Sequence, residues 1–396
     1  MERLIRKYAD KLVSHGLAAP GEPLLAGLDS EIVWNRPDKR TALLATLFDT
    51  LSINSLLFAR PAQPYAAIID YLAARADEAI FPIDCESRTF FHDLPVAREF
   101  SAKTIAAALR RRKSVTIPGE GIVTFGAVSP EQAFVTFSSV CFACYVKFHL
   151  DYLRDARAGT LTPEQRAVFE LAAAMPNPLP ETPPAVRRGP FTSDSAVLEA
   201  IWEAGRLTVE YHMVDSFFGN VSCRRGDTLF ITQTGSSLDE LPGRIDGCPM
   251  DGSSCAGLTA SSELKAHHEI ALRSGCTAVL HGHPKFSVIL SMDCPKAHCD
   301  REGECHIKCP EIRSVCGVPV VPGEVGAGQF GLATTLPPVF ASGHTAGIVY
   351  GHGLFTTGAV DFSDAFATML SVERNCREEY FRRVAQAGLD RGEAAR

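Results

Sequence analysis

Two segments far apart in the chain repeat one another, and this repeat restricts the possible fold more than any other feature. Gly119–Phe134 (GEGIVTFGAVSPEQAF) aligns without a gap with Gly351–Phe366 (GHGLFTTGAVDFSDAF). Upstream, Leu56–Pro61 (LLFARP) aligns with Val279–Pro284 (VLHGHP). Chance similarity between glycine-punctuated strand–turn–helix segments is the alternative. Because several matches come in one order, we interpret them as a duplication and expect two related α/β domains.

A proline-rich stretch lies between the two halves. Met175–Pro190 (MPNPLPETPPAVRRGP) contains too many prolines for a helix or a central strand. We therefore predict a degenerate domain over residues 1–174, a linker over residues 175–194 and a second domain over residues 195–396. With 396 residues, 46% of them hydrophobic, the chain has enough apolar material for two cores.

Charge and composition exclude several functional classes. The formal net charge is −7 and Arg110–Lys113 is the one basic block, so we expect no nucleic-acid partner. No run of about eighteen apolar residues and no N-terminal export signal is present, which argues against membrane insertion and secretion. Thirteen cysteines in such a chain are typical of a reducing compartment, where thiols stay free or bind metal. We expect a cytoplasmic protein.

Apolar periodicity and capping residues predict the main elements. Helices are expected over residues 2–15, 40–50, 65–74, 102–112, 129–157, 195–212, 262–273 and 363–387. Strands are expected over residues 55–58, 114–117, 122–125, 228–232 and 345–350, and around the histidine pair at 281–283.

Three histidines in the second half form a candidate metal site. His281 and His283 are two residues apart after an apolar run, and on an extended strand such residues point to the same face. His352 lies between two glycines after another apolar strand. Three imidazoles with an open fourth position are typical of catalytic zinc. The alternative is a set of partly buried histidines that are hydrogen-bonded without a metal.

The first half lacks all of these histidines at the aligned positions. Phe58 and Arg60 replace the histidine pair, and Glu120 replaces His352. Arg40 stands where the second half has Glu263. We therefore predict that the N-terminal copy binds no metal and has a structural role.

Small and polar residues before the histidine strand suggest an anion site. Ser261-Ser262-Glu263 precedes an apolar helix, and either caps that helix or binds a phosphate at its N-terminus. A carboxylate beside a metal can also transfer protons. Gly219-Asn220 and the turn Ile231–Gly235 (ITQTG) add amide and hydroxyl donors.

Residues from about Ser195 to Ala387 resemble the class II aldolase/adducin family. The resemblance is based on the order of five motifs, G-N-V-S, I-T-x-T-G, S-S-E, H-x-H-P and G-H-G. It implies a three-layer α/β/α domain with a largely antiparallel central sheet, preceded here by a degenerate N-terminal copy. It further implies that one zinc ion, or another divalent metal, is held by His281, His283 and His352. Glu263 would be the catalytic acid/base, and the substrate phosphate would lie among Gly219, Asn220, Thr234, Gly235, Ser261 and Ser262.

The resemblance also implies the reaction. In such an aldolase, zinc acts as a Lewis acid and stabilises the enediolate that forms when the C–C bond of a phosphorylated sugar breaks. Family epimerases have S-S-D where this chain has Glu263, which favours C–C cleavage. A sugar-phosphate epimerase or decarboxylase and a non-catalytic adducin-like interaction protein are the alternatives. A small phosphorylated sugar as substrate and a homo-oligomeric assembly are expected.

Two features depart from the family pattern. Family enzymes often use a tyrosine that is absent from the aligned stretch 321–324, so Glu324 or Tyr380 is a candidate replacement. Cys294–Cys316 is an extra segment with five cysteines, His298 and His306. It either binds a structural zinc or carries free thiols or disulfides.

Overall fold

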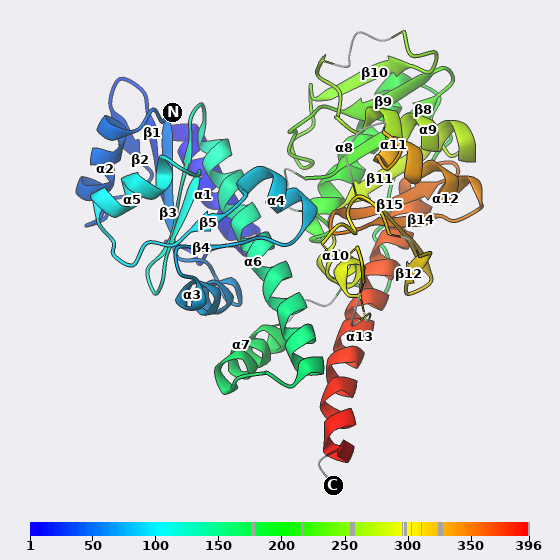
Figure 1. Cartoon of the computed structure of the whole chain (residues 1–396). Coiled ribbons are helices and arrows are strands. Elements are labelled where there is room, and N and C mark those ends of the chain that lie inside the picture. Colours follow the sequence, from blue (N-terminus) through cyan, green and yellow to red (C-terminus); the bar gives the residue numbers. More distant parts are fainter. Residues whose placement is uncertain are drawn as a thin grey trace. The chain divides into compact units, whose positions relative to one another are not determined.

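The computed structural model describes residues 1–175, 179–214, 218–253, 258–294, 296, 299–301, 303–309, 311–323 and 328–394, with side chains described up to residue 388. The chain divides into two compact units, Met1–Asn177 and Pro178–Arg396 (Figure 1). The boundary between them falls in the proline-rich stretch. Each unit has a sheet of its own.

The first unit contains a five-stranded antiparallel sheet in the order β2-β1-β3-β7-β6. Its elements are α1 (Glu2–Ser14), β1 (Leu24–Leu28), β2 (Ile32–Trp34), α2 (Thr41–Thr50), β3 (Ser55–Ala59), α3 (Tyr65–Arg75), β4 (Ala79–Ile80), α4 (Cys85–Phe91), β5 (Leu94–Pro95), α5 (Ala102–Leu109), β6 (Ser114–Ile117), β7 (Gly121–Gly126), α6 (Pro130–Ala158) and α7 (Pro163–Ala174).

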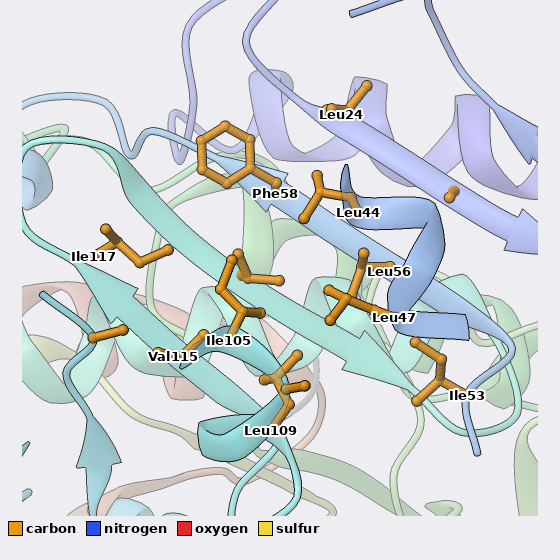
Figure 2. Packing of buried hydrophobic residues seen from close by; sticks show 14 residues of the cluster. Leu24, Leu44, Leu47, Ile53, Leu56, Phe58, Ile105, Leu109, Val115 and Ile117 are labelled. Atoms are coloured by element: carbon orange, nitrogen blue, oxygen red, sulfur yellow. The ribbon is translucent and has the colours of Figure 1, made fainter. Parts of the chain in front are cut away.

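Strand alternation divides the side chains of this sheet between two helical layers. Leu56 and Phe58 of β3 belong to one cluster with Leu44 and Leu47 of α2, and the cluster continues to Ile105 of α5 (Figure 2). Helix α6 packs against β3 and β7. It is long and apolar enough to pass for a membrane span, but 83% of its apolar window is buried inside the structure, as is usual for a core helix.

The second unit contains an eight-stranded sheet in the order β10-β9-β8-β11-β15-β14-β13-β12. The pair β13–β14 is parallel and all other pairs are antiparallel. Its elements are α8 (Asp194–Glu210), β8 (Asn220–Arg225), β9 (Thr228–Thr232), β10 (Ile245–Pro249), α9 (Leu264–Ser274), β11 (Ala278–Gly282), α10 (Lys285–Met292), β12 (Arg313–Val315), β13 (Val318–Val321), α11 (Leu332–Thr335), α12 (Pro337–Ala341), β14 (Ala346–Val349), β15 (Gly353–Gly358) and α13 (Phe362–Ala394).

This second sheet is also covered on both faces. Ile270 of α9, Leu332 of α11 and Phe340 of α12 pack with Val279 and Phe355 on one side. Helix α13 packs against β11 and β15, and α8 and α10 contact α13. The expected α/β fold with a largely antiparallel central sheet between helical layers is confirmed.

The two sheets share a common five-strand pattern. The order β2-β1-β3-β7-β6 corresponds to β9-β8-β11-β15-β14. Ser55 lies opposite Gly126 in the first sheet, and Ala278 lies opposite Gly358 in the second. These are the residue pairs that the sequence repeat aligns. Strand order, direction and register therefore agree between the two sheets.

Most predicted helices and strands are found, with shifted ends and two informative differences. The helix expected from residue 262 begins at Leu264, because Ser261 and Glu263 form a turn in which Ser261 Oγ accepts the Glu263 N–H at 3.2 Å. The extended pair expected at residues 281–283 is interrupted, since β11 ends at Gly282 and α10 begins at Lys285. His283 therefore lies just beyond the strand end.

Helix α10 connects the histidine pair to the long helix α13. The carboxylate of Glu373 on α13 accepts the N–H groups of Phe286 and Ser287 at 2.8 and 2.9 Å. After the last turn of α10, Asp293 pairs with Arg383 of α13 at 2.6 Å. A carboxylate is the expected partner of free N–H groups in the first turn of a helix. Helix α10 is thus held on α13 at both ends.

The buried carboxyl of Glu373 predicts a pH-dependent stability. Burial raises its pKa from 4.5 to about 7, although the two N–H donors act in the opposite direction. Because the folded pKa exceeds the unfolded one, this group stabilises the fold fully below pH 4.5, and the contribution is lost as the pH rises through about 7. The loss amounts to ~3 kcal/mol.

We expect the thermal midpoint of the C-terminal unit to fall between about pH 5 and pH 8, and the Glu373→Gln variant to flatten this fall. Glu378→Gln, an exposed position of the same helix, is the matched control and should keep the wild-type profile. Calorimetric scans across this pH range provide the measurement. An equal fall in the Glu373→Gln variant would contradict the assignment.

Candidate metal centre and active site

Three buried imidazoles converge in the second unit. The Nε2 atom of His281 lies 3.1 Å from Nε2 of His283 and 3.2 Å from Nε2 of His352. Among the described residues, this is the one group of three or more histidine, cysteine or acidic side chains whose ligand atoms all lie within 4.8 Å of one another. The structure therefore brings together the three histidines that the sequence singled out.

Strand pairing and two close approaches produce this convergence. Strand β11 carries His281 and pairs with β15, which begins directly after His352. A Cβ atom on Gly353 would lie 2.7 Å from Cε1 of His281 and 2.9 Å from Cδ2 of His283, so only glycine leaves room for the two rings. Ser291 of α10 accepts the N–H of Gly351 at 2.9 Å, which holds the His352 turn.

Further contacts orient the rings. Nδ1 of His281 lies 3.2 Å from the carbonyl oxygen of Leu354. A proton donated there leaves Nε2 with a free lone pair for a metal. The His281 ring stacks on Phe355 at 3.9 Å between centroids, and the His283 ring stacks on Phe218 at 5.5 Å. The rings are therefore held by packing as well as by hydrogen bonds.

Burial favours the neutral form of these histidines. It lowers the pKa of His281 to about 4 and the pKa of His283 well below its usual value. Neutral imidazole is the form that binds a metal. Nε2 of His281 lies 3.1–3.2 Å from the Nε2 atoms of the other two rings, close enough for one cation to contact all three. The residues present thus fit a divalent metal, with zinc as the usual ion at such nitrogen sites.

Glu263 completes the group as a buried carboxylate. Its Oε1 atom lies 3.2 Å from Nε2 of His352, and its Oε2 atom lies 3.5 Å from Nε2 of His281. The amide of Asn220 donates to Oε2 at 2.8 Å. Burial alone would raise the pKa of this carboxyl, but the two imidazoles and the amide outweigh it and hold the pKa below its usual range. These contacts therefore favour the charged form of the carboxyl.

The predicted phosphate residues lie on the loops beside this group. Gly219 has φ +88°, and a Cβ atom there would lie 2.6 Å from the carbonyl oxygen of His281. Thr234 donates through its hydroxyl to the carbonyl of Ala260 at 3.0 Å. This bond places the turn of Thr234 and Gly235 next to Ser261 and Ser262. The structure brings these four residues together at the surface, where Thr234, Gly235 and Ser262 are exposed.

Asn220, also predicted near the phosphate, donates its side-chain amide to Glu263. Sequence reasoning also missed two polar groups near the site. Ser222 of β8 lies 2.7 Å from Nδ1 of His267, whose pKa burial lowers to about 3. Ser236 has a buried hydroxyl without a partner among the described residues, next to the Thr234 turn. In the sequence, the position of Ser236 directly after I-T-Q-T-G could have indicated that it lies near the site.

In the first unit, an ion pair occupies the aligned positions. The guanidinium of Arg40 lies 4.9 Å from the ring centroid of Phe58 and 3.5 Å from the carboxylate of Glu120. Arg60 pairs with Asp70 at 2.7 Å. Within this unit, the described residues contain no cluster of three metal ligands.

The two departures from the family pattern have different outcomes. Tyr380 is fully buried and packs against Phe286 and Phe381, as a core residue would. Glu324 and His298 lie outside the described residues. The five cysteines of the extra segment (Cys294, Cys299, Cys305, Cys309 and Cys316) are free thiols, and neither they nor His306 belong to a described three-ligand cluster.

Comparisons with known proteins find similarity to the second unit. Residues 199–380 match the family described as Class II Aldolase and Adducin N-terminal domain. No curated protein matches the chain.

Among solved structures, the L-fuculose-1-phosphate aldolase of Thermus thermophilus is 24% identical, with a TM-score of 0.37, over 47% of this chain and 94% of its own. YgbL of Klebsiella pneumoniae, a putative aldolase/epimerase/decarboxylase, is 22% identical, with a TM-score of 0.37, over 48% of this chain and 90% of its own. A sugar-phosphate aldolase of Thermotoga maritima is 18% identical, with a TM-score of 0.34, over 48% of this chain and 96% of its own.

The matched region contains the three converging histidines, Glu263 and the loops beside them. Within the C-terminal unit, it is this stretch that matches the class II aldolase and adducin family.

Proposed function

We propose that the C-terminal unit is a zinc-dependent class II aldolase, which cleaves or forms a C–C bond in a phosphorylated sugar. One observation supports this proposal above all others. A buried carboxylate, Glu263, lies within 3.2 and 3.5 Å of two of three converging imidazoles. A site with this composition can bind a cation and move a proton at the same place.

In the proposed site, His281, His283 and His352 hold the metal. A bound divalent ion supplies a Lewis acid that polarises carbonyl and hydroxyl oxygens and compensates negative charge as the C–C bond breaks. The low exposure of the histidines, 1 to 3%, keeps water away and strengthens this electrostatic effect.

Glu263 is the proposed acid/base. Its pKa is held below the usual range, so it begins as a base and accepts a proton from the substrate carbon in the direction of bond formation. In the direction of cleavage, the carboxylate would first accept the proton of the substrate hydroxyl that becomes the carbonyl, and would then deliver it to the carbon that carries the negative charge. The Asn220 amide, which donates to Oε2 at 2.8 Å, keeps the carboxylate oriented during both steps.

The substrate phosphate would bind at the loops beside Glu263. In the proposed set, the hydroxyls of Ser261 and Ser262 and the backbone N–H groups of Gly219 and Gly235 supply donors. Thr234 holds the turn through its bond to the Ala260 carbonyl, and the N-terminus of α9 favours a negative charge. Asn220 also belongs to the proposed set, because its side-chain NH2 group has a second N–H besides the one that donates to Glu263. Holding the phosphate fixes the reacting carbon relative to the carboxylate.

The N-terminal unit is proposed to be a metal-free copy with a structural role, with domain limits at residues 1–174 and 195–396 and a linker between them. The ion pair of Arg40 and Glu120, where the second unit has Glu263 and His352, supports this proposal. A reducing, cytoplasmic location agrees with the free thiols described.

A change that spares every proposed ligand tests the metal centre. We expect Gly353→Ala to lose at least about tenfold in zinc affinity, because the added methyl group collides with the His281 and His283 rings. Gly121→Ala is the matched control. In both variants the added methyl group collides with a backbone carbonyl, at 2.4 Å from Ala59 for Gly121→Ala and at 2.5 Å from Gly282 for Gly353→Ala. Only the Gly353 methyl group also collides with histidine rings. Competition with a chromogenic chelator measures the affinity, and equal losses in both variants would contradict the assignment.

A cleavage screen tests the reaction. Purified, zinc-loaded protein should release an aldehyde from one or more ketose phosphates, and Glu263→Gln should lower kcat by about 10²–10⁴-fold with zinc still bound. An epimer as sole product would favour the epimerase alternative, and release of carbon dioxide would favour a decarboxylase. Binding of a partner protein with no turnover of any tested sugar phosphate would favour the adducin-like alternative.

We further propose that the chain assembles as a homo-oligomer. Light scattering on the full-length protein should give a mass that is a multiple of 42.8 kDa. A single-chain mass at micromolar concentration would contradict the assembly without affecting the proposed chemistry.

A further inference from the structure

Two cysteines outside the metal centre are placed next to one another from distant parts of the second unit. Cys316 lies in the turn between β12 and β13 and is exposed, and Cys376 lies on α13 and is buried. The buried thiol of Cys376 donates a hydrogen bond to the sulfur of Cys316. Arg313 of β12 and Arg383 of α13 both bind Asp293, which holds this hairpin beside the helix. Neither cysteine has a part in the proposed catalysis.

The backbone at Cys316 is unusual for a cysteine. Val315 pairs with Val318, so Cys316 and Gly317 form a two-residue hairpin loop. Their φ angles are +49° and +80°. Such a loop favours asparagine, aspartate or glycine at its first position, because other side chains are strained there. A strained residue whose thiol contacts a second thiol suggests a chemical function.

We propose that Cys316 and Cys376 form an oxidisable dithiol, which hydroperoxides convert to a disulfide between the β12–β13 turn and helix α13. This is a modification site separate from the metal centre, and it does not depend on the proposed aldolase activity.

The roles of the two thiols follow from their surroundings. The hydrogen bond from Cys376 lowers the pKa of Cys316, and Arg383 and Arg382 act in the same direction, against partial burial and Glu379. The thiolate is the nucleophilic form of cysteine. Cys376 is buried and its pKa is raised, first by the bond to Cys316 and then by burial. Cys316 is therefore the attacking residue and Cys376 the resolving one.

The reaction balances with hydrogen peroxide as oxidant. The Cys316 thiolate attacks one peroxide oxygen, an S–O bond forms, the O–O bond breaks and hydroxide leaves. Cys316 is now a sulfenic acid. The Cys376 sulfur then attacks the Cys316 sulfur, an S–S bond forms, and the leaving hydroxide takes the Cys376 proton as water. In total, two thiols and one peroxide give one disulfide and two waters.

Oxidation would add a covalent link to the part of α13 that holds α10. Cys376 follows Glu373 by three residues, and Glu373 accepts the first N–H groups of α10. The β12–β13 turn would then be tied to the same helical segment.

Trypsin makes the linkage directly readable. Cleavage after Arg313, Arg374 and Arg377 places Cys316 in peptide 314–374 and Cys376 in the tripeptide 375–377, each with a single cysteine. Native full-length protein is treated with hydrogen peroxide, blocked with N-ethylmaleimide, digested and analysed by mass spectrometry. We expect the two peptides to appear joined, and a reductant to release the tripeptide.

Three variants separate the roles. In Cys376→Ser, Cys316 should stop at the sulfenic acid and react with dimedone. In Cys316→Ser, Cys376 should remain a thiol, because nothing else brings peroxide to its buried sulfur. Cys294→Ser removes another exposed thiol and should leave the joined peptide unchanged. Cys316 should react at least about tenfold faster than Cys294 in the native protein.

The proposal fails if the joined peptide does not form in native protein, if it forms only in denaturant, or if Cys316 pairs mainly with another cysteine. It also fails if Cys316 and Cys294 react at similar rates. Zinc content measured on the same samples should not change, so this outcome is distinguishable from failure of the proposed metal centre.

Discussion

The pairing of β11 with β15 is the interaction on which the candidate site depends. His281 and His352 are 71 residues apart in the chain, and the antiparallel register brings their Nε2 atoms within 3.2 Å. The glycine at position 353 lets the two strands approach closely and leaves room for the imidazoles of His281 and His283. Glu263 reaches the same point because it precedes α9, which packs on the face of β11 that carries Val279 and His281. A sheet without this register would keep all four residues and lose the site.

The first unit carries different side chains on a similar strand frame. It has the same five-strand order and register, yet Arg40, Phe58 and Glu120 occupy the aligned positions. The guanidinium of Arg40 lies over the Phe58 ring and pairs with the Glu120 carboxylate, so its positive charge is balanced within the unit. The sheet and its two helical layers thus supply the frame, and the side chains at a few equivalent positions determine whether it can hold a cation.

The sequence predicted those parts of the structure that have strong local signals. The repeat, the helices with clear capping residues and the three histidines required only pattern and spacing. It did not predict that Asn220 would face Glu263, because the bond joins a strand start and a helix start 43 residues apart. It also missed α7, although Thr162 and Pro163 are a good helix start, and it treated His283 as part of a strand that ends one residue earlier.

Helix α13 has a role that periodicity alone could not reveal. Glu373 and Arg383 hold the two ends of α10, and α10 follows His283 while its Ser291 holds the turn before His352. Both histidine segments are therefore supported by one short helix, which in turn is fixed by one long helix. Any change that moves α13 along its axis must act on α10 before it reaches the metal ligands. The rigidity of the site then depends on buried hydrogen bonds between helices as much as on the sheet, since imidazoles must hold their geometry for a metal to bind tightly.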